Sequence, residues 1–71
     1  MKVTLIKHHN EPISIGYGPF CFSIENGGVA DNVASKIGCQ QIQGKLAEYN
    51  RALALCRFAW EHSMYDEVVE Q

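Results

Sequence analysis

The spacing of the apolar residues changes once along the chain, near residue 28, and this change limits the folds that the chain can adopt. Before it, apolar and polar side chains alternate in short runs, and after it the apolar residues recur at helical spacing. Alternation is typical of a β-strand and the longer spacing of an α-helix. The sequence therefore predicts one α+β domain over residues 1–71, with a β-sheet part at 1–27 and a helical part at 28–71.

The β-sheet part contains three candidate strands. Apolar residues alternate with polar ones over 2–8, 13–17 and 20–25, and the segments 10–12 and 18–19 between them carry the Asn, Gly and Pro of turns. We therefore expect a small antiparallel sheet of two to three N-terminal strands.

The helical part is predicted to be a short helix followed by a long one. Val29, Val33 and Ile37 recur every four residues, and Gly38 would be the glycine that ends this helix. The alternative for 29–33 is a strand, because Asn26-Gly27 is a strong hairpin signal. From 40 to 69 there is no Pro and no turn cluster, and the composition favours a single long C-terminal helix packed across the sheet.

This long helix is predicted to be apolar on two sides. At about 100° per residue, one stripe that should pack on the sheet consists of Ile42, Leu46, Tyr49, Leu53, Cys56, Trp60 and Met64. A second face, largely apolar and on the opposite side, consists of Ala47, Arg51, Ala54, Leu55, Phe58, His62 and Tyr65. A helix that is apolar on two sides is normally covered on both, so we interpret the second face as the interface with another copy or with a protein partner.

The size of the chain supports this interpretation. A domain of 71 residues buries only about 60% of its unfolded surface, and chains this short usually add disulfides, a metal or a partner subunit. Three cysteines, an odd number, and the lack of a secretory signal pattern at the start favour a reduced, cytoplasmic setting. No apolar stretch reaches the length of a membrane span, and a net charge of −2 is too balanced to imply nucleic acid or an anionic membrane as a partner. Among these additions we therefore expect a partner subunit, in a homo-oligomer for which a dimer is the simplest case.

Catalytic and metal-binding patterns are weak. The cysteines Cys21, Cys39 and Cys56 and the histidines His8, His9 and His62 show neither C-x-x-C nor H-x-x-x-H spacing. The glycines of Gly16-Tyr17-Gly18 and Gly27-Gly28 are not followed by the residues of a phosphate-binding loop. We therefore predict no catalytic residues, no metal and no cofactor. A small enzyme with a Cys/His site is kept as a second alternative.

The first alternative is a DNA-binding regulator. Residues 33–41 look like the first helix and turn of a helix-turn-helix motif, with Ala34 and Gly38 at the positions where the motif has a small residue and a turn glycine. The second helix departs from the pattern, since Gly44 lies where a buried aliphatic residue is expected. The side chains that would contact DNA in this alternative are Gln40, Gln41, Gln43 and Lys45.

The function that the sequence favours is that of a small non-enzymatic binding or regulatory protein acting as a homo-oligomer. A phage-type or mobile-element inhibitor, which blocks a host macromolecule or sequesters a small ligand, fits this description. The expected partners are a second copy and another protein. A small-molecule ligand ranks below these, nucleic acid below that, and no membrane is expected.

Overall fold

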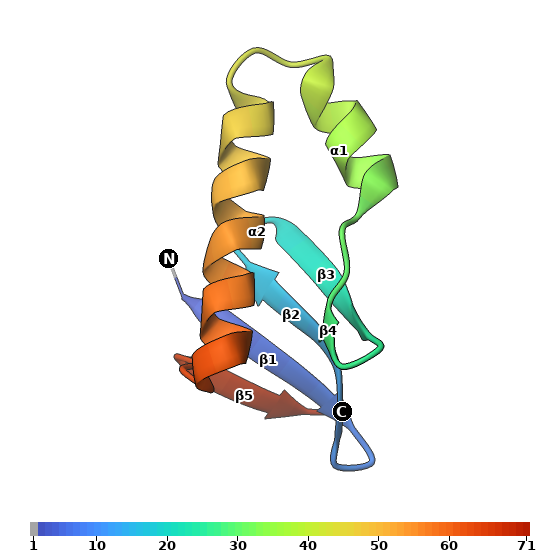
Figure 1. Ribbon diagram of the computed structural model, residues 1–71, viewed down its shortest axis with the longest axis vertical. Helices are drawn as coiled ribbons and strands as arrows, with labels where there is room; N and C mark the ends of the chain where they lie inside the picture. Colours follow the sequence, from blue (N-terminus) through green and yellow to red (C-terminus); the bar gives the residue numbers. More distant parts are fainter. Residues whose placement is uncertain (1) are drawn as a thin grey trace.

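The computed structural model describes residues 2–71 and has a five-stranded mixed sheet with both helices on one of its faces (Figure 1). Along the chain the elements are β1 (Val3–His8), β2 (Glu11–Tyr17), β3 (Phe20–Glu25), β4 (Gly28–Val29), α1 (Val33–Gln40), α2 (Lys45–His62) and β5 (Glu67–Glu70). The α+β class predicted from the sequence is confirmed. The sheet is larger than the two to three strands expected, because β4 and β5 come from the part predicted as helical.

The first three strands form an antiparallel meander, as their alternation predicts. The pairing places Leu5 opposite Ile15 and Ile15 opposite Phe22, so these three side chains share one face of the sheet. All three are buried, with exposed fractions of 4%, 0% and 1%. This row forms the floor of the core on which α2 packs.

The last strand, β5, overturns the prediction of helix up to residue 69. It pairs in parallel with β1, which makes β1 an inner strand and gives the order β4-β3-β2-β1-β5. The backbone N–H of Asp66 donates to the carbonyl of Val3 at 3.0 Å, and a carboxylate oxygen of Asp66 accepts from the N–H of Val3 at 2.8 Å. These two bonds fix the start of β5 beside the start of β1.

The predicted helix over 40–69 is interrupted at two points, so that only Lys45–His62 forms α2. Its first break lies at residues 41–44, where Gly44 adopts a φ of 82°. Glycine takes such a left-handed conformation without steric cost, so the chain can turn here between α1 and α2. The second break is Ser63, which is also left-handed, with a φ of 52°.

The segment 29–37, for which helix was preferred over strand, contains both. Val29 belongs to β4, and helix α1 begins only at Val33. Asn32 caps this helix, since its side-chain oxygen accepts from the N–H of Ser35 at 3.1 Å. Gly38 lies inside α1 and does not end it, which corrects the predicted cap.

The face of α2 that packs on the sheet is shorter along the helix than the predicted stripe. Tyr49, Leu53 and Cys56 are buried as predicted, but Ile42 and Met64 are 57% and 61% exposed because both lie outside α2. The buried alanines of α2, which the prediction missed, are Ala52 and Ala59. Small side chains at these positions allow the helix to approach the sheet closely.

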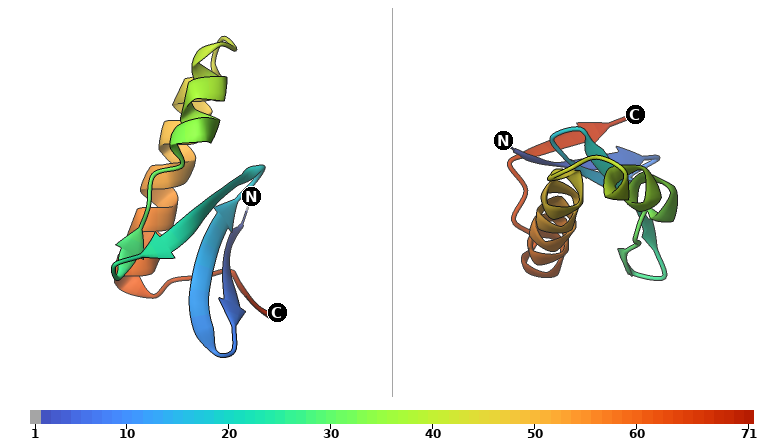
Figure 2. Two further views of the ribbon diagram at one scale, coloured as in Figure 1. Left: turned by 90° about the vertical axis from the view of Figure 1, so that its right-hand side faces the viewer. Right: turned by 90° about the horizontal axis from the view of Figure 1, so that it is seen from above.

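The hairpin formed by α1 and α2 extends past the end of the sheet (Figures 1 and 2). The sheet covers the C-terminal part of α2, while the N-terminal part and α1 contact each other. Within residues 2–71, neither helix has the length and apolar character needed to cross a membrane.

Candidate interaction surface

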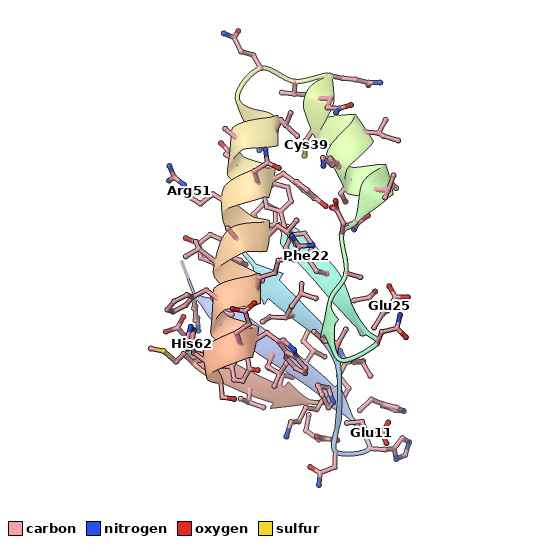
Figure 3. All side chains as sticks on the ribbon, in the orientation of Figure 1. Glu11, Phe22, Glu25, Cys39, Arg51 and His62 are labelled. Atoms are coloured by element: carbon pink, nitrogen blue, oxygen red, sulfur yellow. The ribbon has the colours of Figure 1, made fainter. Side chains whose placement is uncertain are left out.

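The most prominent surface feature is the side of α2 that faces away from the sheet. We call it the outer face and define it by Ala47, Arg51, Ala54, Leu55, Phe58 and His62. All six side chains are exposed. Leu55 is 37% exposed and Phe58 53%, and Arg51 and His62 project from the same side of the helix, away from α1 (Figure 3).

Tyr65, the seventh residue predicted for this face, lies elsewhere. Helix α2 ends at His62, and the left-handed Ser63 redirects the chain. Tyr65 is therefore in the connection to β5, where its partly buried ring packs against the core. Burial raises the pKa of its phenol above the usual range. The prediction failed at this residue because it continued the helical spacing past the true end of α2.

At the C-terminal end of the outer face, Phe58 and His62 form a pair. They are one helical turn apart, and their ring centroids lie 4.3 Å from each other. Residues at this spacing on a helix are neighbours on its surface. The two rings form one continuous raised aromatic feature on the outer face.

Near the N-terminal end of the outer face lies a cleft of about 240 Å³, lined by Tyr17, Pro19, Phe20, Glu48 and Arg51. Its floor comes from the β2–β3 turn and its wall from α2. The rings of Phe20 and the buried Tyr49 meet edge to face, with centroids 5.7 Å apart, so this side of the cleft is held by the core. Sequence reasoning missed the cleft, because no local signal predicts that residues 17–20 lie against the N-terminal part of α2.

Two further hollows are more open to solvent. One, of about 470 Å³, lies between the β3–β4 turn and the C-terminal half of α2 and includes Arg57 and Trp60. The indole N–H of Trp60 donates to the carbonyl of Gly27 at 3.0 Å and thereby holds this turn against the helix. The other, of about 310 Å³, lies between the β2–β3 turn and the helical hairpin and includes Cys39 and Ile42. The charged residues in their linings are Arg57 and Glu61 in the larger hollow and Lys45 in the smaller one.

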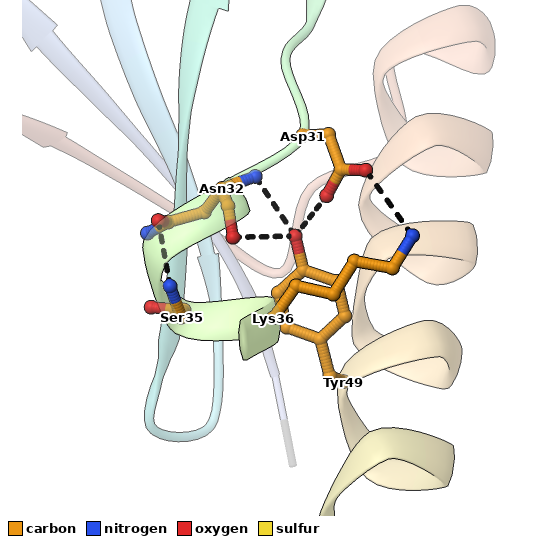
Figure 4. A network of polar contacts seen from close by, with 5 residues as sticks. All are labelled: Asp31, Asn32, Ser35, Lys36 and Tyr49. Carbon is orange, nitrogen blue, oxygen red and sulfur yellow. Dashed lines mark hydrogen bonds and ion pairs between the residues drawn. The ribbon is translucent and has the colours of Figure 1, made fainter. Parts of the chain in front are cut away.

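A polar network positions α1 (Figure 4). The hydroxyl of Tyr49 accepts from the backbone N–H of Asn32 at 2.8 Å and is hydrogen-bonded to the carboxylate of Asp31. The Asp31 carboxylate also faces the ammonium group of Lys36 at 3.6 Å. The hydrogen bond from Tyr49 lowers the pKa of Asp31, and burial raises the pKa of Tyr49. This network joins the start of α1 to the N-terminal part of α2, which is a structural role.

The three cysteines differ in their exposure to solvent. Cys39 and Cys56 are buried, and burial raises the pKa of the Cys56 thiol to about 11, which makes it a poor nucleophile at neutral pH. Cys21 is exposed, because its side chain lies on the sheet face opposite Phe22. No group of three His, Cys, Asp or Glu side chains that could hold a metal ion occurs among residues 2–71.

The four residues proposed to contact DNA lie at the tip of the helical hairpin. Gln40 ends α1, Gln41 and Gln43 are in the turn, and Lys45 begins α2. The ammonium group of Lys45 is 3.3 Å from the Glu48 carboxylate, which reduces the positive charge available to a phosphate. Moreover, α1 and α2 run antiparallel and side by side (Figure 1), whereas the helices of a helix-turn-helix cross at roughly 90–120°.

Comparison of the chain with protein-family models, with curated proteins and with solved structures gave no match.

Proposed function

We propose that the chain is a non-enzymatic binding protein that acts as a homodimer, with the outer faces of α2 from the two copies packed antiparallel. The observation that carries this proposal is the exposure of Leu55 and Phe58 on the side of α2 away from the sheet. The polar network at Tyr49, the raised pKa of Cys56 and the open hollows support a binding role over a catalytic one.

The spacing of the outer-face residues suits a two-fold axis. Their positions are symmetric about the point between Ala54 and Leu55. An antiparallel partner centred there would place the partner's Leu55 against Ala54 and the partner's His62 against Ala47. Large side chains would thus meet small ones at these two positions, and each contact would occur reciprocally, as in any isologous interface.

The charged residues also suit this pairing. It would bring the Arg51 guanidinium over the ring of the partner's Phe58, a cation–π arrangement. It would bring the Glu48 carboxylate beside the partner's His62, whose imidazole can donate a hydrogen bond to it. Because the axis is two-fold, each contact would occur twice.

The dimer would leave the outward side of α1 uncovered. Val33 and Ile37 of α1 are 62% and 54% exposed, and α1 lies on the other side of α2 from Arg51 (Figure 3). We propose that this side supplies the surface with which the dimer binds and blocks another macromolecule. An inhibitor of the type found in phages and mobile elements would work in this way.

Sedimentation equilibrium on the full chain tests the dimer. At about 10–100 µM, above the micromolar dissociation constants of the weaker standard-size interfaces, the expected mass is twice that of the 8.0 kDa chain. Phe58→Asp should shift the mass to that of the monomer, because it places a charge in an apolar contact. Ile37→Asp is the matched control, since Ile37 is 54% exposed and Phe58 53%. A monomer mass for the unmodified chain throughout this range would refute the proposal.

A further inference from the structure

We infer that the cleft lined by Tyr17, Pro19, Phe20, Glu48 and Arg51 is a socket for the aromatic ring of the partner's Phe58. The inference rests on the proposed homodimer and specifies which residue of one copy completes which site on the other. Both halves of the contact are present in one chain, as a raised aromatic pair and a hollow on the same helix.

The ring and the cleft lie on the same flank of α2. At about 100° per residue, Phe58 is displaced around the helix by only about 20° from Arg51, and His62 by about 40° from Glu48. A two-fold axis perpendicular to the plane of an antiparallel helix pair places the same flank of both helices on the same side of that plane. Consequently the flank that carries the partner's Phe58 faces the flank that contains the cleft.

The positions along the helix agree as well. The proposed axis lies between residues 54 and 55, and Arg51 and Phe58 are equally distant from it in sequence. At about 1.5 Å per residue, each lies about 5 Å from the axis, measured along α2. The partner's Phe58 therefore reaches the level of Arg51, at the mouth of the cleft. The same operation places this chain's Phe58 at the partner's cleft.

The lining of the cleft suits an aromatic ring. Tyr17 and Phe20 offer ring edges and faces, with which aromatic side chains pair favourably, and Arg51 offers a cation. The volume of about 240 Å³ is below the roughly 300–1,000 Å³ of small-molecule sites, so one inserted side chain is a better occupant than a separate ligand. Phe20 is held by its contact with the Tyr49 ring, which keeps the socket preformed.

A double-mutant cycle on the dimer dissociation constant tests the contact. Arg51 and Phe58 are two turns apart in one chain, about 10.5 Å along the axis, and substitutions that distant normally act independently. If the partner's Phe58 meets Arg51, Phe58→Ala should weaken the dimer by about tenfold or more. Arg51→Ala should then have a smaller effect on the dissociation constant in the Phe58→Ala background than in the unmodified chain. Independent effects, or a Phe58→Ala dimer of unchanged affinity, would overturn the socket. Ile37→Ala is the control of equal exposure and should leave the constant unchanged.

A photo-crosslink gives a second, direct readout. Phe58→p-benzoylphenylalanine should crosslink to the partner within residues 17–20 or to the segment 48–51, as read by mass spectrometry of the linked peptides. The same probe at Ile37 is the control and should give no such product. A dimer whose crosslinks from position 58 fall only elsewhere refutes the socket and leaves the proposed dimer standing. A chain that remains a monomer refutes both.

Discussion

The hydroxyl of Tyr49, in the N-terminal part of α2, accepts a hydrogen bond of 2.8 Å from the backbone N–H of Asn32, the residue that caps α1. The Tyr49 side chain is fully buried, with an exposed fraction of 0%. It therefore contributes its ring to the core and its oxygen to the start of the neighbouring helix. Two consequences for stability follow from this relationship.

The first prediction is that Tyr49→Phe destabilises the fold by about 1–3 kcal/mol. The ring is kept, but the partly buried N–H of Asn32 loses its acceptor, and an unsatisfied buried donor costs about this much. Urea unfolding followed by circular dichroism measures the change. Tyr17→Phe is the control, because the structure gives the Tyr17 hydroxyl no hydrogen bond within residues 2–71, and its effect should be well below that of Tyr49→Phe.

The second prediction concerns acid. The hydrogen bond from Tyr49, followed by the charge of Lys36, lowers the pKa of Asp31 below its usual 3.8. A carboxylate whose pKa is lower in the folded state contributes stability above its unfolded pKa and loses it as the pH falls through the folded one. The free energy of unfolding should therefore decrease below about pH 4, and Asp31→Asn should make this decrease shallower. An unchanged acid slope in Asp31→Asn would contradict the assignment.

The third prediction concerns alkali. Burial raises the pKa of Cys56 from 9.0 to about 11, so the folded state keeps a proton that the unfolded state releases. The sign is the reverse of that for Asp31, since stability is full below pH 9 and is lost as the pH rises to about 11. Cys56→Ala should be less stable at pH 7, because it leaves a small cavity, but should lose less stability between pH 9 and 10. Above pH 10 the raised pKa of Tyr49 adds to the loss of stability, so Cys56→Ala and the unmodified chain should be compared below pH 10.

The fourth prediction concerns the reactivity of the thiols. Cys21 is exposed, whereas Cys39 and Cys56 are buried. An aromatic disulfide reagent at pH 8 should therefore modify one cysteine per chain quickly and the other two only as fast as the fold opens. In the Cys21→Ser variant the fast phase should disappear. A fast phase that persists in this variant would show that a buried thiol is accessible.

The sequence was sufficient for the parts of the fold that local spacing determines. Alternation identified β1, β2 and β3, and the helical spacing identified the buried Tyr49, Leu53 and Cys56. Strand β5 could not be found in this way. Val68 and Val69 between two glutamates fit a helix end as well as a strand, and only the pairing with β1, more than 60 residues earlier, decides between them.

The candidate site also has a part that local spacing predicts and a part that only the three-dimensional structure shows. The outer face of α2 was predicted from helical spacing, and the structure places six of its seven residues together. Tyr65 was lost because Ser63 adopts a left-handed conformation, which few non-glycine residues do. The cleft beside Arg51 required the three-dimensional approach of the β2–β3 turn to α2, for which the sequence carries no periodic signal.

The two glycines of the helical hairpin give the last prediction, and their roles are opposite to those that spacing indicated. Gly38, predicted to end a helix, lies inside α1, and an added Cβ there would meet nothing within 4 Å. Gly38→Ala should stabilise the fold by about 0.5–1 kcal/mol, since alanine favours helix over glycine by this amount. Gly44 has open space too, but its φ is +82°, and a side chain in that conformation costs about 1–2 kcal/mol. Gly44→Ala should therefore destabilise the fold. Thermal unfolding of the two variants under identical conditions measures both effects, and a stabilising Gly44→Ala would mean that the turn between α1 and α2 is not the one described.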